Sequence, residues 1–235
     1  MKRIILIILM LVLTAAQAAA AGETAADPYR TAGSIVTLGS FEQDNNPDNG
    51  PEAIEWIVLD VQDGESLLVS TCILDARKYN ETYAEITWED CSLRAWLNDA
   101  FFASVFREEE QSAILTVETD NSAAQGCSRF RTSGGNNTQD RVFLLSYAET
   151  ERYFSSEAAR RCPVTDYSAA RGAHTSYSHA DKRLNGLWWL RSPGNAQYRV
   201  SVVYSGGALN VTYASKESGG VRPALWLDPD LLPAP

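Results

Sequence analysis

The segment Trp188-Trp189-Leu190-Arg191-Ser192-Pro193-Gly194 places two adjacent tryptophans in a short apolar run that ends in turn-forming residues. In a β-strand, successive side chains point to opposite faces, so Trp188 and Trp189 would point in opposite directions. We therefore expect one tryptophan to fill the core and the other to lie nearer the surface. Burial of both tryptophans is the alternative.

More β-strands are predicted around this segment. Short β-branched or aromatic runs occupy Leu187–Arg191, Tyr198–Tyr204, Ala208–Tyr213 and Val221–Leu227. Ser205-Gly206-Gly207 separates the second run from the third and predicts a β-hairpin.

The N-terminal third also has the pattern of strands. Runs of this kind cover Ser34–Phe41, Ala53–Val61 and Glu65–Leu74. Gln62-Asp63-Gly64 lies between the last two, and an Asp-Gly pair in this position is a strong hairpin signal.

The middle of the chain predicts helices. In Cys91–Asn98 the apolar residues recur at helical spacing, and Ser146 with Glu149 forms a capping-box pattern. Further short helices are expected at Glu108–Ile114 and Thr165–Arg171, with a polar loop at 120–140 and a strand at Val142–Leu145. Strands, then helices, then strands predict an α+β fold in which distant strands share a sheet and the helices of Ser92–Ile114 pack on one side.

Composition restricts the class of protein. The 235 residues are 45% hydrophobic and include ten Tyr, seven Phe and six Trp, too many for a disordered chain. The formal net charge of −10 argues against nucleic-acid binding, which needs clustered Lys and Arg.

Residues 1–21 have the pattern of a signal peptide: Lys2 and Arg3, the apolar run Ile4–Leu13, and small residues where cleavage would occur. Cleavage would remove two cations and leave a net charge of −12. We expect a secreted or extracytoplasmic protein with no membrane span after cleavage. The predicted organisation is a tether at 22–33, one domain at 34–228 and a tail at 229–235.

Four cysteines follow the leader: Cys72, Cys91, Cys127 and Cys162. Their even number in an exported chain favours two disulfides, with four buried thiols as the alternative. None of them forms a C-x-x-C pair, and neither His174 nor His179 has metal-ligand spacing, so no zinc site is predicted. Both histidines fall in Gly172–Ala180, which is predicted to be an exposed loop.

No cofactor, metal ligand or catalytic residue is predicted. Asp44–Gly50 offers oxygen ligands of the kind that Ca²⁺ uses, so a structural calcium ion is considered, but the segment lacks EF-hand spacing and is more typical of a turn. Carboxylate pairs are abundant, and none stands out for general acid–base chemistry.

The candidate ligand-binding residues are polar or aromatic side chains around the late hairpin, which turns at Ser205-Gly206-Gly207, and the Gly-rich loop Ser133–Asp140. An aromatic surface suits stacking on sugar rings or anchoring a protein. The first candidates are Trp188, Arg191, Tyr198, Arg199, Tyr204 and Asn210. The second candidates are Asn136, Asn137 and Asp140. Arg191 and Arg222 have an alternative structural role, because an arginine can pin loops through carbonyls or carboxylates.

Several motifs occur in a characteristic order. They are Trp88-x-x-Cys91-x-Leu93-Arg94-x-Trp96-Leu97-Asn98, Ser133–Asp140, Trp188–Gly194 and Gly220-Val221-Arg222-Pro223-Ala224. Together they resemble an uncharacterised bacterial family of secreted or surface proteins, a domain of unknown function. The ending is more distantly similar to the C-type-lectin-like fold in its formylglycine-generating-enzyme version, which implies a mixed sheet with helices on one side and long irregular loops.

The chain departs from the chemistry of those relatives. No cysteine follows Cys162, so formylglycine chemistry is not expected. Asn46-Pro47-Asp48 precedes the helices and Leu97-Asn98-Asp99 falls on one, so calcium-lectin action is not expected either. The function predicted is an exported binding module whose partner is a glycan or a surface protein. An extracellular glycan hydrolase and an interaction or scaffold domain are the alternatives.

Overall fold

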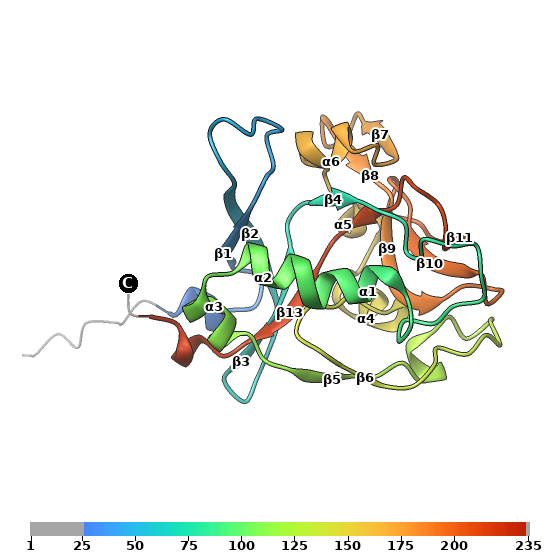
Figure 1. Cartoon of the computed structure of the whole chain (residues 1–235), viewed down its shortest axis with the longest axis horizontal. Coiled ribbons are helices and arrows are strands. Elements are labelled where there is room, and N and C mark those ends of the chain that lie inside the picture. The colour runs from blue at the N-terminus through green and yellow to red at the C-terminus, as the bar shows by residue number, and fades with distance from the viewer. Residues whose placement is uncertain (1–25, 234–235) are drawn as a thin grey trace, which may run out of the picture.

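The first of two main sheets contains the early strands and one late strand. The computed structural model describes residues 26–233 (Figure 1), so the predicted leader lies outside the described residues. The sheet has the order β1-β2-β3-β13, and all neighbours are antiparallel. Its strands are β1 (Ile35–Phe41), β2 (Glu52–Gln62), β3 (Glu65–Ser70) and β13 (Ala224–Leu227).

The turn between β2 and β3 is the predicted Asp-Gly hairpin. Asp63 and Gly64 both have positive φ, 52° and 90°. Positive φ at both central residues is the geometry of a type I′ turn, whose twist matches that of the flanking strands. The prediction of this hairpin is confirmed.

The second sheet has the order β11-β10-β9-β12-β4. Its strands are β4 (Asp75–Ala76), β9 (Trp188–Pro193), β10 (Arg199–Val203), β11 (Leu209–Tyr213) and β12 (Gly220–Val221). The predicted hairpin at Ser205-Gly206-Gly207 joins β10 to β11, where the Gly207 N–H donates to the Tyr204 carbonyl at 2.7 Å.

Two segments cross from one sheet to the other. The consecutive strands β3 and β4 belong to different sheets, and so do the consecutive strands β12 and β13. The predicted strand Val221–Leu227 is thus divided at Arg222-Pro223. Arg222 is buried there, and its Nε donates to the Ser70 carbonyl at 3.0 Å, which ties the two crossings together. The alternative structural role of Arg222 is confirmed.

Both tryptophans of β9 are fully buried, which corrects the expectation that one would lie nearer the surface. β9 lies inside the sheet, and both of its faces are covered. Trp188 packs on Phe154, and its Nε1 donates to the Arg160 carbonyl at 3.1 Å. On the other face, Trp189 packs on Tyr79.

The first helices follow one another without a break and form one helical segment, which contributes large side chains to the core. In Figure 1 this segment lies in front of the two sheets. It consists of α1 (Ser92–Trp96), a π-helical turn (Leu97–Phe101) and α2 (Phe102–Val105), and α3 (Glu108–Ala113) follows. Phe106, just after α2, packs on Trp56 of β2 with ring centroids 6.2 Å apart.

The remaining helices are short and capped. They are α4 (Tyr147–Tyr153), α5 (Glu157–Arg160) and α6 (Asp166–Ala170), with 3₁₀ turns at Pro28–Arg30, Ala123–Gln125 and Pro229–Leu231. The predicted capping box of α4 is present, since the Ser146 hydroxyl accepts from the Glu149 N–H and the Glu149 carboxylate accepts from the Ser146 N–H.

Two predictions of local structure in the middle of the chain are wrong. Val142–Leu145 forms only an isolated bridge, Phe143 to Ala224, and the polar loop instead contributes β6 (Thr138–Asp140), paired with β5 (Val117–Thr119). The predicted loop Gly172–Ala180 contains β7 (Thr175–Ser178), paired with β8 (Arg183–Gly186). These strands are polar, so they lack the apolar alternation that identifies a strand in a sequence.

Arg191 is a structural anchor, as its alternative role predicted. Its side chain is buried and pairs with both carboxylate oxygens of Glu149, one of them at 2.7 Å from Nη2. It also donates to the carbonyls of Leu144 and Asp120, at 2.9 and 3.1 Å. Arg191 therefore connects β9 to α4 and to the start of the long polar loop.

The predicted α+β class is confirmed, and distant strands do share sheets, as in β3 with β13 and β4 with β12. Among residues 26–233 there is no helix of the length and apolarity that crossing a membrane requires.

Replacing Arg191 should destabilise the fold. Arg191→Met removes the cation that pairs with Glu149 and the donor to two carbonyls, so we expect the free energy of unfolding in urea to fall by about 3 kcal/mol or more. Arg152→Met is the control, because Arg152 forms an exposed ion pair with Asp60 and should cost no more than about 1 kcal/mol. Equal losses for the two variants would contradict the anchoring role.

Candidate functional site

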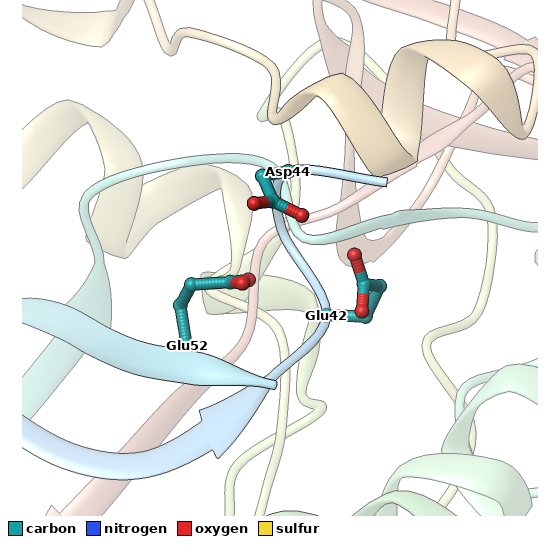
Figure 2. A group of neighbouring side chains, drawn as sticks. All are labelled: Glu42, Asp44 and Glu52. Carbon is teal, nitrogen blue, oxygen red and sulfur yellow. The ribbon is translucent and has the colours of Figure 1, made fainter. Parts of the chain in front are cut away.

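Three carboxylates converge at the loop that joins β1 to β2. Figure 2 shows Glu42, Asp44 and Glu52 turned toward a common space, and one oxygen from each lies within 4.8 Å of the others. These are the residues with which the described chain could hold a metal ion, and their oxygen atoms would suit Ca²⁺.

The same carboxylates are already used by the loop. Glu42 and Asp44 both accept from the Asn46 N–H at 2.8 Å, Asp44 also accepts from the Asn49 amide, and Glu52 accepts from the Gln43 N–H at 2.7 Å. These bonds agree with the interpretation of Asp44–Gly50 as a turn.

Buried carboxylates elsewhere serve the fold. Asp140 accepts from Trp88, Arg94 and Thr138 at 2.9, 2.6 and 2.6 Å. Asp75 pairs with Arg77, and Glu110 pairs with Arg107 while it accepts from the Gly39 N–H. Each of these carboxylates thus connects elements of the fold.

A hollow of about 720 Å³ lies between the 3₁₀ turn Pro28–Arg30, β1 and the segment that follows β13. Two polar groups that line it are engaged within the protein. The Glu110 carboxylate accepts from the Gly39 N–H, and the Tyr29 hydroxyl donates to the Thr37 carbonyl at 2.7 Å. This hollow therefore presents few free groups to a ligand.

An exposed aromatic cluster lies at the open end of the β10–β11 hairpin. Tyr198 precedes β10 and Tyr213 ends β11, and their rings stack with centroids 6.0 Å apart and planes at 14°. Tyr83 completes the cluster, with centroids 5.4 Å from Tyr198 and 5.8 Å from Tyr213. We call Tyr83, Tyr198 and Tyr213 the tyrosine platform.

Tyr83 reaches the platform because its loop is tied to the hairpin on both sides. The Asn80 N–H donates to the Ala214 carbonyl at 3.0 Å. Two hydrogen bonds join Ile86 and Gln197. The Ile86 N–H donates to the Gln197 carbonyl at 3.1 Å, and the Gln197 side-chain amide donates to the Ile86 carbonyl at 2.9 Å. The loop is thus held by backbone contacts, while the Tyr83 side chain remains 64% exposed.

A hollow of about 530 Å³ adjoins the platform. It is lined by Tyr83, Thr212, Tyr213, Ser215 and Lys216. Hydroxyl groups, aromatic faces and one ammonium group therefore face the same space, and Tyr213 is 45% exposed beside it. Such a surface can stack on a flat ligand face and also donate hydrogen bonds.

Arg199 lies against the platform. Its guanidinium is 4.7 Å from the Tyr213 ring centroid, and Nη2 donates to the Tyr213 hydroxyl at 3.2 Å. That hydrogen bond raises the pKa of Arg199, which keeps the group cationic.

Three of the residues predicted from sequence cannot contact a surface ligand. Trp188, Arg191 and Asp140 are each at most 3% exposed. Trp188 fills the core, Arg191 holds Glu149, and Asp140 holds Trp88 and Arg94. The sequence pattern could not reveal this burial, because covering elements come from distant parts of the chain.

Asn136 and Asn137 are exposed but hold the Gly-rich loop in place. Asn136 donates to Glu89 at 2.9 Å, and the Asn137 side chain accepts from the Asn121 N–H at 3.0 Å. These contacts give both asparagines a structural role in the loop Ser133–Asp140.

The four remaining candidates lie on the late hairpin, but only two of them are at the tyrosine platform. Tyr198 is part of the platform, and Arg199 lies against it. Tyr204 and Asn210 are exposed near the closed end of the hairpin, where Val203 pairs with Leu209, away from the platform at its open end. Tyr83 was not predicted, since nothing local marks it within its polar loop.

All four cysteines are free, which favours thiols over two disulfides; Cys91, Cys127 and Cys162 are buried, as the alternative predicted, whereas Cys72 is half-buried. Cys127 differs from the others because it lines a cavity of about 210 Å³ beside Pro193. Burial of its thiol raises the pKa, but hydrogen bonds with Arg129 and Tyr147 outweigh this and lower the pKa below its ordinary value. Burial raises the pKa of Cys91 and of Cys162 to about 12.

Comparison with known proteins gives one match. A family described as "Domain of unknown function (DUF6273)" matches residues 63–229. The range begins at Asp63, after β1 and β2, and includes the whole platform. No curated protein matches the chain, and no solved structure does.

Cys127 should be the most reactive thiol. Its lowered pKa gives a larger thiolate fraction at neutral pH, and its cavity admits a small reagent. We expect iodoacetamide to modify Cys127 first, as measured by peptide mass spectrometry over time at pH 7. Arg129→Gln should shift the rate–pH midpoint upward, whereas Arg131→Gln should not. Faster modification of Cys72 would contradict this assignment.

Proposed function

The chain belongs to the DUF6273 family, a domain of unknown function, and we propose that it is a carbohydrate-binding module that works through its tyrosine platform. The observation that carries the proposal is the cluster of the exposed Tyr83 and Tyr213 with the half-buried Tyr198, next to a hollow with hydroxyl and ammonium groups. Sugar rings have apolar faces formed by C–H groups and polar edges formed by hydroxyls, and a surface of this kind complements both.

The composition of the surface favours a sugar over a protein partner. A docking surface for a protein would expose a contiguous apolar patch of several hundred Å². The large hydrophobic side chains exposed on the described chain are mostly tyrosines, and those of the platform lie among polar residues. A polar hollow with aromatic walls therefore supports the glycan interpretation.

The platform is also preorganised. Tyr198 and Tyr213 are fixed by the register of β10 and β11, in which Arg199 pairs with Tyr213. The Tyr83 loop is fixed by its bonds to Gln197 and Ala214. Little conformational entropy remains to be lost when a ligand binds, so a modest contact area can give measurable affinity.

The proposal includes export and a lectin-like relationship. Export rests on the signal-peptide pattern of residues 1–21, which would place the module outside the bacterial membrane with the tail and tether flanking one domain. The lectin-like relationship rests on the order of the tryptophan strand, the late hairpin and the final Gly220-Val221-Arg222 segment.

The test is binding of residues 22–235 to an immobilised panel of neutral and acidic glycans. Tyr83→Ala combined with Tyr213→Ala should reduce the affinity for any bound glycan at least about ten-fold, because both rings are central contacts. The thermal unfolding midpoint should stay nearly unchanged, since both side chains are exposed.

Tyr177→Ala is the matched control. Tyr177 is 53% exposed on β7, outside the platform, and its removal should leave glycan binding intact. No binding of the wild-type protein to any glycan at millimolar concentration would overturn the proposal, as would equal losses for Tyr177→Ala and the platform variant.

A further inference from the structure

Two cations at the tyrosine platform have no carboxylate partner. Within residues 26–233, neither Arg199 nor Lys216 takes part in an ion pair. Lys216 lines the hollow, and Arg199 lies against Tyr213. In a chain with a net charge of −10, two unpaired cations beside one cluster are unexpected.

Two acidic side chains near the platform are directed to another cation. Glu217 and Glu81 both lie next to Lys78, with Nζ–O distances of 3.5 and 3.8 Å. Arg199 itself contacts the ring and the hydroxyl of Tyr213. The positive charge at the platform is therefore not neutralised by the protein.

Arg199 also keeps most of its hydrogen-bonding capacity. A guanidinium has five N–H donors. Among the described residues, Nη2 donates one N–H to the Tyr213 hydroxyl, and Nε is buried without a partner and is out of a ligand's reach. The two N–H groups of Nη1 and the second N–H of Nη2 remain without a partner there. An arginine that lies over an aromatic ring and keeps donors on both Nη atoms can form a forked pair with a carboxylate through them.

We propose that the platform binds acidic sugars, with the sugar ring stacked on the tyrosines and its carboxylate held by Arg199 and Lys216. This inference rests on the proposed function and names the class of glycan. The carboxylate supplies the partner that both cations lack, while the ring uses the aromatic faces that a simple anion would leave empty.

The test compares an acidic sugar with its own uncharged ester. Short oligogalacturonates and their methyl esters have the same rings and differ only in the charge of the carboxyl group. We expect calorimetry to show the acid binding about ten-fold or more tightly than the ester, because a charge-assisted forked pair is lost in the ester. Added NaCl should weaken binding of the acid and leave binding of the ester nearly unchanged.

Variants at the cations separate the acid preference from glycan binding itself. Arg199→Gln and Lys216→Gln should each lower the acid-to-ester affinity ratio toward one, because each removes a contact that only the carboxylate uses. Arg199→Lys, which keeps the charge but loses the fork, should retain part of the preference. Lys182→Gln is the control, since Lys182 is exposed at the β7–β8 turn away from the platform.

The outcomes distinguish the two proposals. Equal binding of acid and ester by the wild type would overturn the acid preference and keep the carbohydrate-binding function. An acid preference that persists in both Gln variants would assign the charge recognition elsewhere and overturn the inference. Binding of neither sugar, together with binding of a neutral glycan from the panel, would overturn the inference alone.

Discussion

Burial of β9 on both faces is the constraint on which the rest of the structure depends. Its two indole N–H groups must find acceptors inside the protein, because water cannot reach them. Trp188 donates to the Arg160 carbonyl, which places α5, and Trp189 donates to the Arg77 carbonyl at 2.8 Å. The second bond fixes the start of the loop that carries Tyr83, so core packing and the position of the surface platform are connected.

The arginines of this protein divide into two groups by the partners that they meet. Arg191 and Arg222 are buried, and their donors are used to connect strands, helices and loops. Arg199 lies nearer solvent, where the protein supplies one acceptor and no carboxylate. Burying a guanidinium without partners would cost on the order of several kcal/mol. Arg191 meets a carboxylate and two carbonyls, whereas Arg222 meets one carbonyl and the rings of Phe154 and Trp188.

Part of the candidate site was predictable from local sequence. The Ser-Gly-Gly turn predicted the β10–β11 hairpin, and the hairpin brings Tyr198 and Arg199 near Tyr213. Trp188, Arg191 and Asp140 were assigned to a surface because the elements that cover them, such as α4 and α5, are distant in sequence. Tyr83 could not be predicted, since its place depends on hydrogen bonds from its loop to Gln197 and Ala214.

The sequence by itself determined the features that depend on a few neighbouring residues: the Asp63-Gly64 turn, the Ser146 capping box, the apolar strands and hence the α+β class. Only the tertiary structure decided which strands share a sheet, which side chains are exposed, and which cations are left without a carboxylate. Backbone conformation and capping are set within one turn of chain, whereas burial and ion pairing depend on segments brought together by folding. The tyrosine platform depends on both, because two of its rings come from one hairpin and the third comes from a distant loop.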